Sequence, residues 1–262
     1  MKERRILGGI LAALGAILGL VVSFLLFISW YEPMQAAEIA AGRPDEQIIV
    51  KYIIPVLSDF GILAGALYAV GAYGFFTRRE WAWPLAVIAN VLALEGSFFP
   101  MIPAASRGLP PAFGLVFIPN LVLFLLLHQV VRNGRWNRTV FCLFAGMAFV
   151  LSFMNGVAST DRIMVMGNPL YFAVQRLNWV ASIGWGVATC GILLSPKEWV
   201  RVVAMSAAVL EVVVGFPLGI ATTINFGHFS MFFPAPALSL ILLVLLAIPR
   251  AWDRIAVGKP AG

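Results

Sequence analysis

Apolar segments long enough to cross a lipid bilayer recur along most of this sequence. The hydrocarbon core of a bilayer is about 30 Å thick, and an α-helix crosses it in about 20 residues. By that measure the sequence predicts about eight spans, at residues 6–31, 52–76, 81–104, 112–131, 139–158, 169–195, 200–224 and 235–249. Lipid offers no partner to an open backbone, and these segments are too long and too uniformly apolar for barrel strands. We therefore expect an all-α integral membrane protein.

The composition argues against a soluble domain. Of the 262 residues, 61% are hydrophobic and only 11% are charged, whereas a soluble domain carries roughly 25% charged residues. The N-terminal apolar stretch follows a basic segment, as in a signal peptide. It is far longer than the roughly 7–15 apolar residues of a signal peptide, so we interpret it as a retained first span.

Basic residues concentrate in alternate loops of the predicted topology. One set lies before the first span, after the last, and in every second loop between them: Lys2, Arg4, Arg5, Arg78, Arg79, Arg132, Arg135, Arg138, Lys197, Arg201, Arg250, Arg254 and Lys259. The opposite loops hold only Arg43, Lys51, Arg107 and Arg162. By the positive-inside rule, this pattern predicts a multi-pass protein of the cell membrane with both termini in the cytoplasm. The net charge of +6 is then a topological signal, and we expect no nucleic-acid partner.

Proline-containing motifs recur in the same order in the two halves of the chain. Phe99-Pro100 and Phe216-Pro217 are spaced 117 residues apart, and so are Pro119 and Pro236. Each half would hold an even number of spans and insert with the same orientation. We therefore predict two parallel four-helix repeats, residues 1–131 and 132–262, related by a pseudo-twofold axis along the membrane normal within one membrane domain. Chance similarity between apolar sequences is the alternative.

Two carboxyl groups fall deep inside predicted spans. Glu95 lies 14 residues after Trp81, and Glu211 lies 12 residues after Trp199, which places both near the middle of the bilayer. A charge there costs about 2.5–3.5 kcal/mol on insertion scales, so such groups face a cavity or the interior of the bundle. We predict that Glu95 and Glu211 bind a substrate, an ion or a proton. The alternative is a structural role, in which each neutral side chain is hydrogen-bonded to a neighbouring helix.

Asp59 and Arg176 are also related by the spacing of 117 residues, since 176 − 59 = 117. Both fall near the outer ends of their spans. Opposite charges at corresponding positions predict a pair between the repeats, which would act as an outer gate or a clamp. In the alternative, each side chain reaches the outer headgroup region separately.

Pro100 and Pro217 interrupt the third and seventh predicted spans. Proline removes a backbone donor and frees a carbonyl group, so we predict helix breaks at both positions. Paired broken helices mark binding sites in transporters. The alternative is that the helices simply end near the outer surface.

The sequence predicts no metal site and no cofactor. His128 and His228 fall on opposite predicted sides of the membrane, and Cys142 and Cys190 lie inside apolar segments, where packing is the expected role of cysteine. No nucleotide-binding or hydrolase motif is present.

The main functional hypothesis is a small transporter or channel-like protein. Its central path would be lined by Glu95 and Glu211, with proton or cation coupling and with a small ion or solute as ligand. One alternative is an accessory or assembly subunit, whose buried charges pair with partner membrane subunits. The other is a membrane-embedded lipid-binding protein or enzyme, with Glu95 or Glu211 as acid or base and with His228 and Arg107 at a headgroup. The scarcity of polar residues makes an enzyme the less expected reading.

Overall fold

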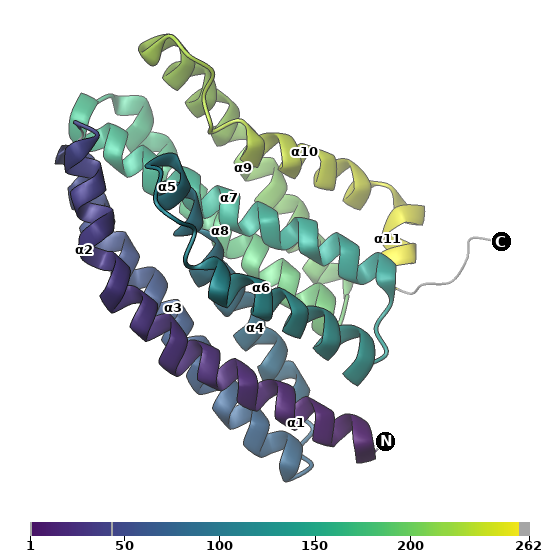
Figure 1. Ribbon diagram of the computed structural model, residues 1–262. Helices are drawn as coiled ribbons and strands as arrows, with labels where there is room; N and C mark the ends of the chain where they lie inside the picture. The colour runs from purple at the N-terminus through teal and green to yellow at the C-terminus, as the bar shows by residue number, and fades with distance from the viewer. Residues whose placement is uncertain (1, 43, 257–262) are drawn as a thin grey trace. The chain divides into compact units, whose positions relative to one another are not determined.

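The chain folds almost entirely into helices (Figure 1). The computed structural model describes residues 2–42 and 44–256, which are 87% helical and contain no strand. Within these residues, seven helices are long and apolar enough to cross a membrane, or eight if the bent pair α10 (Pro234–Ala247) and α11 (Pro249–Ala256) forms one span. The prediction of an all-α chain is confirmed, with helices long and apolar enough to cross a membrane. The chain divides into two compact units, Met1–Arg135 and Trp136–Gly262, which are described separately.

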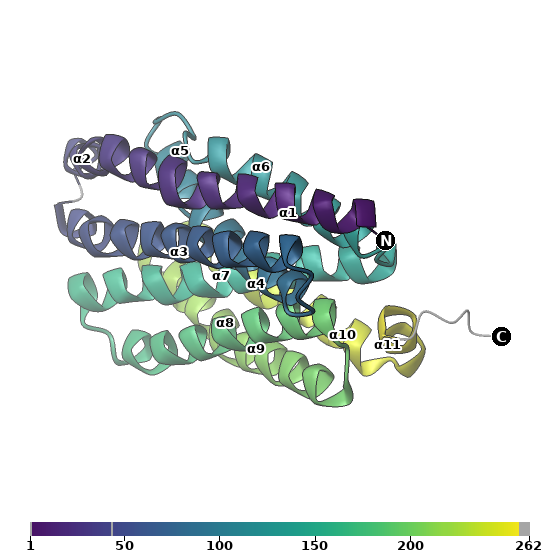
Figure 2. The ribbon, with the colours of Figure 1, turned by 90° about the horizontal axis from the view of Figure 1, so that it is seen from below.

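The first unit begins with a single long helix. It consists of α1 (Lys2–Ile17), a π-helical turn η1 (Leu18–Ser23) and α2 (Phe24–Ala40). The elements that follow are α3 (Pro44–Phe76), α4 (Ala82–Phe98), α5 (Met101–Ser106), α6 (Gly114–Leu125) and a second π-helical turn η2 (Leu126–Val131). Figure 2 shows α1 running beside α3.

The connection between the first two spans differs from the sequence expectation. The predicted spans 6–31 and 52–76 leave residues 32–51 as a connecting loop, but α2 continues to Ala40 and α3 already begins at Pro44. The intervening sequence "MQAAEIAA" is rich in strong helix formers, and proline suits the first turn of a helix. Helix propensity therefore extends both spans beyond their apolar segments.

Small residues allow the helices of the first unit to pack closely. The core holds fully buried alanines from α3 and α4, among them Ala64, Ala86 and Ala89. A side chain at Gly19 would meet backbone atoms of Gly61 and Gly65 at 2.5 Å. Only glycine fits this approach of η1 to α3, as is common at helix contacts in membranes.

The π-helical turn η1 explains why the polar Ser23 occurs in an apolar helix. A π-helical turn shifts the regular hydrogen bonds by one residue and leaves a carbonyl group in need of a partner. Ser23 Oγ donates to the Leu18 carbonyl oxygen at 3.0 Å. The serine is buried, so it stabilises η1 without exposing a polar group to lipid.

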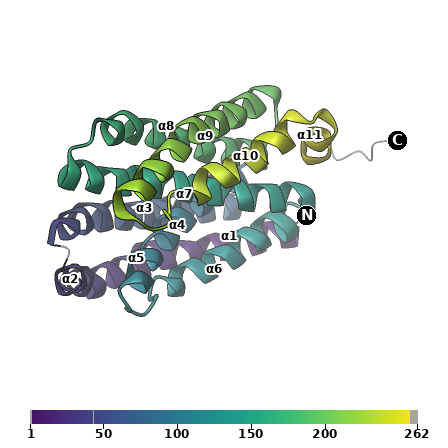
Figure 3. The ribbon, with the colours of Figure 1, turned by 90° about the horizontal axis from the view of Figure 1, so that it is seen from above.

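The described part of the second unit, residues 136–256, contains five helices. They are α7 (Trp136–Met166), α8 (Pro169–Leu194), α9 (Glu198–Phe226), α10 and α11. Asn168 caps α8 by accepting a hydrogen bond from Leu170 N at 2.9 Å. Gly227 ends α9 in the left-handed conformation, with φ of 69°. α11 follows α10 after a bend of 90° (Figure 3).

Two arginines bind the carbonyl groups at the ends of the last helices. Arg201 Nε donates to the Leu246 carbonyl oxygen of α10 at 2.9 Å. Arg138 Nη2 donates to the Ala256 carbonyl oxygen of α11 at 2.8 Å. Cations at helix C-termini complement the helix dipole, so these two basic residues also have a structural role in the second unit.

Candidate functional site

Glu211 forms a buried polar site in the second unit. It lies near the middle of α9 and is completely inaccessible to solvent. Its Oε1 accepts a hydrogen bond at 3.0 Å from Asn155 Nδ2 on α7. The same nitrogen donates to the Phe232 carbonyl oxygen at 3.2 Å. Asn155 thus holds the carboxyl group against the loop that leads into α10.

The second carboxyl oxygen of Glu211, Oε2, is not held by Asn155. Oε2 is buried and makes no hydrogen bond of normal geometry in the described part of the chain, although the Ser152 hydroxyl lies close to the carboxyl group. A buried polar atom without a partner costs free energy, so its presence calls for an explanation. This oxygen can accept a proton or contact a small cation.

Gly215 makes room for the site. It follows Glu211 by one helical turn, and a β-carbon there would lie 2.9 Å from Glu211 Oε1 and 2.9 Å from the Pro236 ring. Glycine therefore lets the carboxyl group and α10 approach the same point on α9. A larger residue would displace one of them.

An apolar cluster covers Glu211 on one side along α9. Val214 and Leu218 of α9 pack there with Tyr171, Val174 and Phe232, all of them buried. Polar groups resume beyond this cluster, where the Tyr171 hydroxyl contacts Thr222 Oγ1 at 3.4 Å and accepts a hydrogen bond from Asn225 at 3.1 Å. Eleven residues of helix, about 16 Å, separate Glu211 from Thr222. The site is closed toward that end of α9.

Glu95 lies in the first unit, on α4, and is 1% exposed. Neither of its carboxyl oxygens has a hydrogen-bond partner among the described residues. The nearby Asn90 is partly satisfied: its Nδ2 donates to the Tyr68 hydroxyl at 2.6 Å and to the Asn120 carbonyl oxygen at 2.9 Å, while its Oδ1 has no partner among the described residues. Glu95 and Glu211 belong to different units, so a shared path stays a prediction.

Asp59 and Arg176 are exposed residues of α3 and α8. Neither makes an ion pair with any residue that the structure describes. They belong to different units, and the predicted pair between them stays a prediction.

The two prolines have different surroundings. Pro100 lies between α4 and α5 and precedes the first residue of α5. Pro217 lies inside α9, which continues without interruption from Glu198 to Phe226. The helix break that we expected at Pro217 is therefore absent. Proline removes only one backbone donor, and the regular helical turns before and after Pro217 keep the helix continuous.

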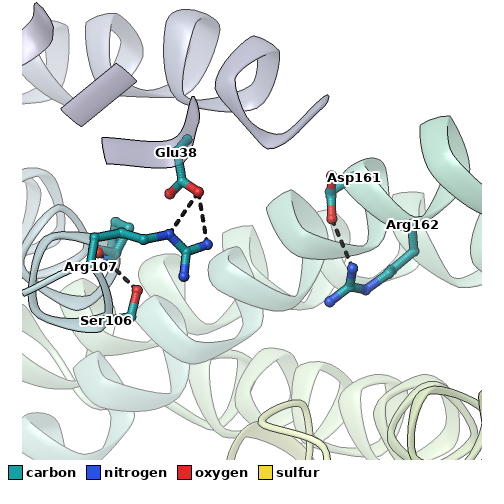
Figure 4. A network of polar contacts seen from close by, with 6 residues as sticks. Glu38, Ser106, Arg107, Asp161 and Arg162 are labelled. Atoms are coloured by element: carbon teal, nitrogen blue, oxygen red, sulfur yellow. Dashed lines mark hydrogen bonds and ion pairs between the residues drawn. The ribbon is translucent and has the colours of Figure 1, made fainter. Parts of the chain in front are cut away.

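Figure 4 shows two of the ion pairs that lie outside the predicted site. Arg107 contacts Glu38 Oε2 through Nε at 2.8 Å and through Nη2 at 2.7 Å. In the second unit Arg162 contacts Asp161 at 3.1 Å and lies 4.3 Å from the centre of the Phe226 ring. We had considered Arg107 as a group that reaches a headgroup, but Glu38 holds it instead.

Sequence reasoning missed Asn155 as the partner of Glu211. The available signal was a polar amide in an otherwise apolar stretch, "LSFMNGVAS", but its distance of 56 residues from Glu211 gave no indication of contact. Within the described residues, no group of three or more His, Cys, Asp or Glu side chains is placed to hold a metal ion.

Comparisons of this chain with models of protein families, with curated proteins and with solved structures found no match.

Proposed function

We propose that this chain is a small multi-pass transporter that moves a proton or a small cation by way of Glu211. The observation that carries the proposal is the closed site around this residue. An acid in the middle of a membrane-spanning helix is held by Asn155 through one oxygen. The other oxygen makes no hydrogen bond of normal geometry among the described residues, and its polar neighbour is the Ser152 hydroxyl. Ionisable groups inside membrane spans commonly mark ion pathways and proton relays.

The surroundings of Glu211 support an occluded binding site. Gly215 leaves the space that the carboxyl group occupies, and the cluster of Val214, Leu218 and Phe232 separates it from the polar groups beyond. In the proposed cycle, these apolar side chains move apart so that Glu211 exchanges its ligand with water. Asn155 then restores the closed arrangement.

We further propose that the two units are copies of one four-helix unit, with the predicted bounds 1–131 and 132–262. The burial pattern supports this proposal. At the spacing of 117 residues, α3 and α8 bury corresponding positions: Ile54 and Tyr171, Leu57 and Val174, Ala64 and Ala181, Tyr68 and Trp185, Ala72 and Thr189, Phe75 and Ile192. Any two helices that each bury one face have matching burial patterns at some spacing. The match supports a duplication because its spacing of 117 residues equals the spacing of the proline pairs in the sequence.

Helices α4 and α9 match at a spacing of 118 residues. The corresponding buried residues are Ala82 and Val200, Ala86 and Ala204, and Ala89 and Ala207. At this spacing Glu211 corresponds to Ala93, and Glu95 corresponds to Val213, which is 62% exposed. The two acids therefore hold different places in the proposed copies. We assign ligand binding to Glu211 and propose Glu95 as a second acid of the path.

Two observations favour transport over the alternative functions. An accessory subunit that pairs its buried charges with a partner would present Glu95 or Glu211 on an exposed surface, but both are buried. A lipid-headgroup enzyme that uses Arg107 would need this side chain free, but Glu38 binds it.

The proposal is tested by proton flux into vesicles. The purified protein is reconstituted into liposomes that contain a pH-sensitive dye, and the external medium is acidified; uptake of radioactive sodium and rubidium ions is measured in parallel. We expect Glu211→Gln to abolish the pH-dependent flux and Glu95→Gln to abolish it as well. Glu198→Gln, at the exposed start of α9, is the matched control and should leave the flux unchanged. Unchanged flux in both Glu211→Gln and Glu95→Gln would reject the mechanism.

A further inference from the structure

Five arginines of the first unit converge on one cavity. The cavity has a volume of about 540 Å³ and is lined by Arg4, Arg5, Arg78, Arg79 and Arg132, together with one acid, Glu80, and apolar side chains. Its formal charge is therefore +4, from five guanidinium groups and one carboxylate. Its volume is in the usual range of ligand sites, about 300–1,000 Å³.

Three separate parts of the chain supply these arginines. Arg4 and Arg5 belong to the first turns of α1, Arg78 and Arg79 lie in the turn between α3 and α4, and Arg132 directly follows η2. The turn has a defined geometry, because Arg78 adopts a left-handed backbone with φ of 60° and Arg79 N donates to the Gly74 carbonyl oxygen at 2.8 Å. A non-glycine residue in this region is uncommon and worth a reason.

Trp83 provides an apolar wall with fixed orientation. Its Nε1 donates to the Leu127 carbonyl oxygen at 3.1 Å. The guanidinium carbon of Arg132 lies 5.0 Å from the centre of the Trp83 ring, a cation–π distance. Phe75 also lines the cavity. The site therefore combines a cationic rim with aromatic surface.

Four arginines of the cavity have no anionic partner among the side chains that the structure describes. Arg4, Arg5, Arg78 and Arg79 make no ion pair with any residue in the described part of the chain. Two basic residues of the second unit, Arg138 and Arg201, instead bind helix carbonyl groups. The positive-inside rule accounts for arginines in this loop region, but it does not account for their convergence on a cavity.

We propose that this cavity binds the phosphate group of an anionic phospholipid. Guanidinium groups form paired hydrogen bonds with phosphate oxygens, and basic pockets between membrane helices are suited to anionic headgroups. The cavity lies where membrane-spanning helices end, so a headgroup reaches it while the acyl chains stay in the bilayer. Trp83 and Phe75 give a lipid an advantage over free phosphate, because they contact its apolar part.

The test compares lipid binding by two triple variants in detergent micelles. Arg78→Gln/Arg79→Gln/Arg132→Gln removes three charges from the cavity. Lys197→Gln/Arg250→Gln/Arg254→Gln removes three charges from the second unit, one just before α9 and two in α11, and is the matched control. Each protein is titrated with phosphatidylglycerol, phosphatidylcholine or inorganic phosphate, and bound molecules are counted by native mass spectrometry. Circular dichroism and thermal unfolding establish that each variant is folded.

We expect phosphatidylglycerol to bind the wild-type protein more tightly than phosphatidylcholine or inorganic phosphate. At about 1 kcal/mol for each basic residue, or roughly fivefold in affinity, the cavity variant should bind phosphatidylglycerol on the order of 100-fold more weakly. The control variant should keep wild-type affinity. Equal losses in both folded variants would overturn the proposal, since the effect would then be one of net charge. Inorganic phosphate that binds as tightly as the lipid would also overturn it. If the triple variant does not fold, Arg132→Gln alone takes its place and should lose about fivefold.

Discussion

Asn155 Nδ2 donates to Glu211 Oε1 at 3.0 Å and to the Phe232 carbonyl oxygen at 3.2 Å, so a single amide group ties α7, α9 and the loop before α10 together. Both of its donors are used. Buried polar groups of this kind are costly when one partner is removed, because the remaining atoms lose their hydrogen bonds.

Asn155→Leu should destabilise the second unit. The substitution leaves Glu211 Oε1 and the Phe232 carbonyl oxygen without their donor, which corresponds to about 1–3 kcal/mol. Thermal unfolding in detergent checks this, with Asn137→Leu at the exposed start of the same helix as control. Equal stability of the two variants would show that the amide does not hold the site.

Gly215→Ala should disturb the site without removing any polar group. The new methyl group would lie 2.9 Å from Glu211 Oε1 and from the Pro236 ring, and overpacking of this kind costs about 1–3 kcal/mol. We expect lower stability and loss of flux. Gly146→Ala, on α7 where a β-carbon meets nothing within 4 Å, should be neutral or more stable, as alanine is the better helix former. Wild-type flux in Gly215→Ala would contradict the proposed crowding.

Gly19→Ala should weaken the first unit. A β-carbon at this position would meet the backbone of Gly61 and Gly65 at 2.5 Å, and backbone atoms cannot move aside as a flexible side chain does. We expect a loss of about 1–3 kcal/mol, measured by unfolding in detergent. A variant as stable as Gly146→Ala would rule out the close approach of η1 and α3.

The Glu38–Arg107 pair should show strong coupling. Its side chains are 5% and 15% exposed, whereas Glu198 in the Glu198–Arg201 pair is 66% exposed. In a double-mutant cycle with glutamine substitutions, we expect about 1–3 kcal/mol for the first pair and about 0.2–1 kcal/mol for the second. The contrast should persist at high salt, which screens exposed charges more strongly. Equal coupling energies would mean that water reaches both pairs.

Most of the fold could be predicted from hydropathy alone. The apolar segments of the first seven spans coincide with helices, because each must satisfy its backbone internally. The eighth segment contains only the 14 residues of α10 before Pro249 and a bend of 90°. Hydropathy did not predict the helix beyond the bend, because α11 contains Arg250, Asp253 and Arg254 and is not an apolar segment. Hydropathy also ended the first span too early, because residues beyond Trp30 that favour helices extend the first helix past its apolar segment.

The acids of the candidate site could be found from the sequence, but their surroundings could not. A carboxylate in an apolar span is conspicuous, as with Glu95 and Glu211. The partner of Glu211 lies 56 residues away on another helix, and Glu38 and Arg107 are 69 residues apart. Helix packing brings such pairs together through small residues such as Gly215, and one sequence does not specify which helices meet.

The central claim, that Glu211 exchanges a ligand during transport, is tested most directly by infrared difference spectroscopy. Reconstituted wild-type protein and Glu211→Gln are compared before and after the external medium is acidified, in the region where protonated carboxyl groups absorb. We predict a carboxyl band that changes with acidification in the wild-type protein and is missing from the spectrum of Glu211→Gln. Identical difference spectra for the two proteins would contradict a role for Glu211 in moving protons. If Glu211→Gln also took up sodium and rubidium ions as the wild-type protein does, the role of Glu211 would be structural.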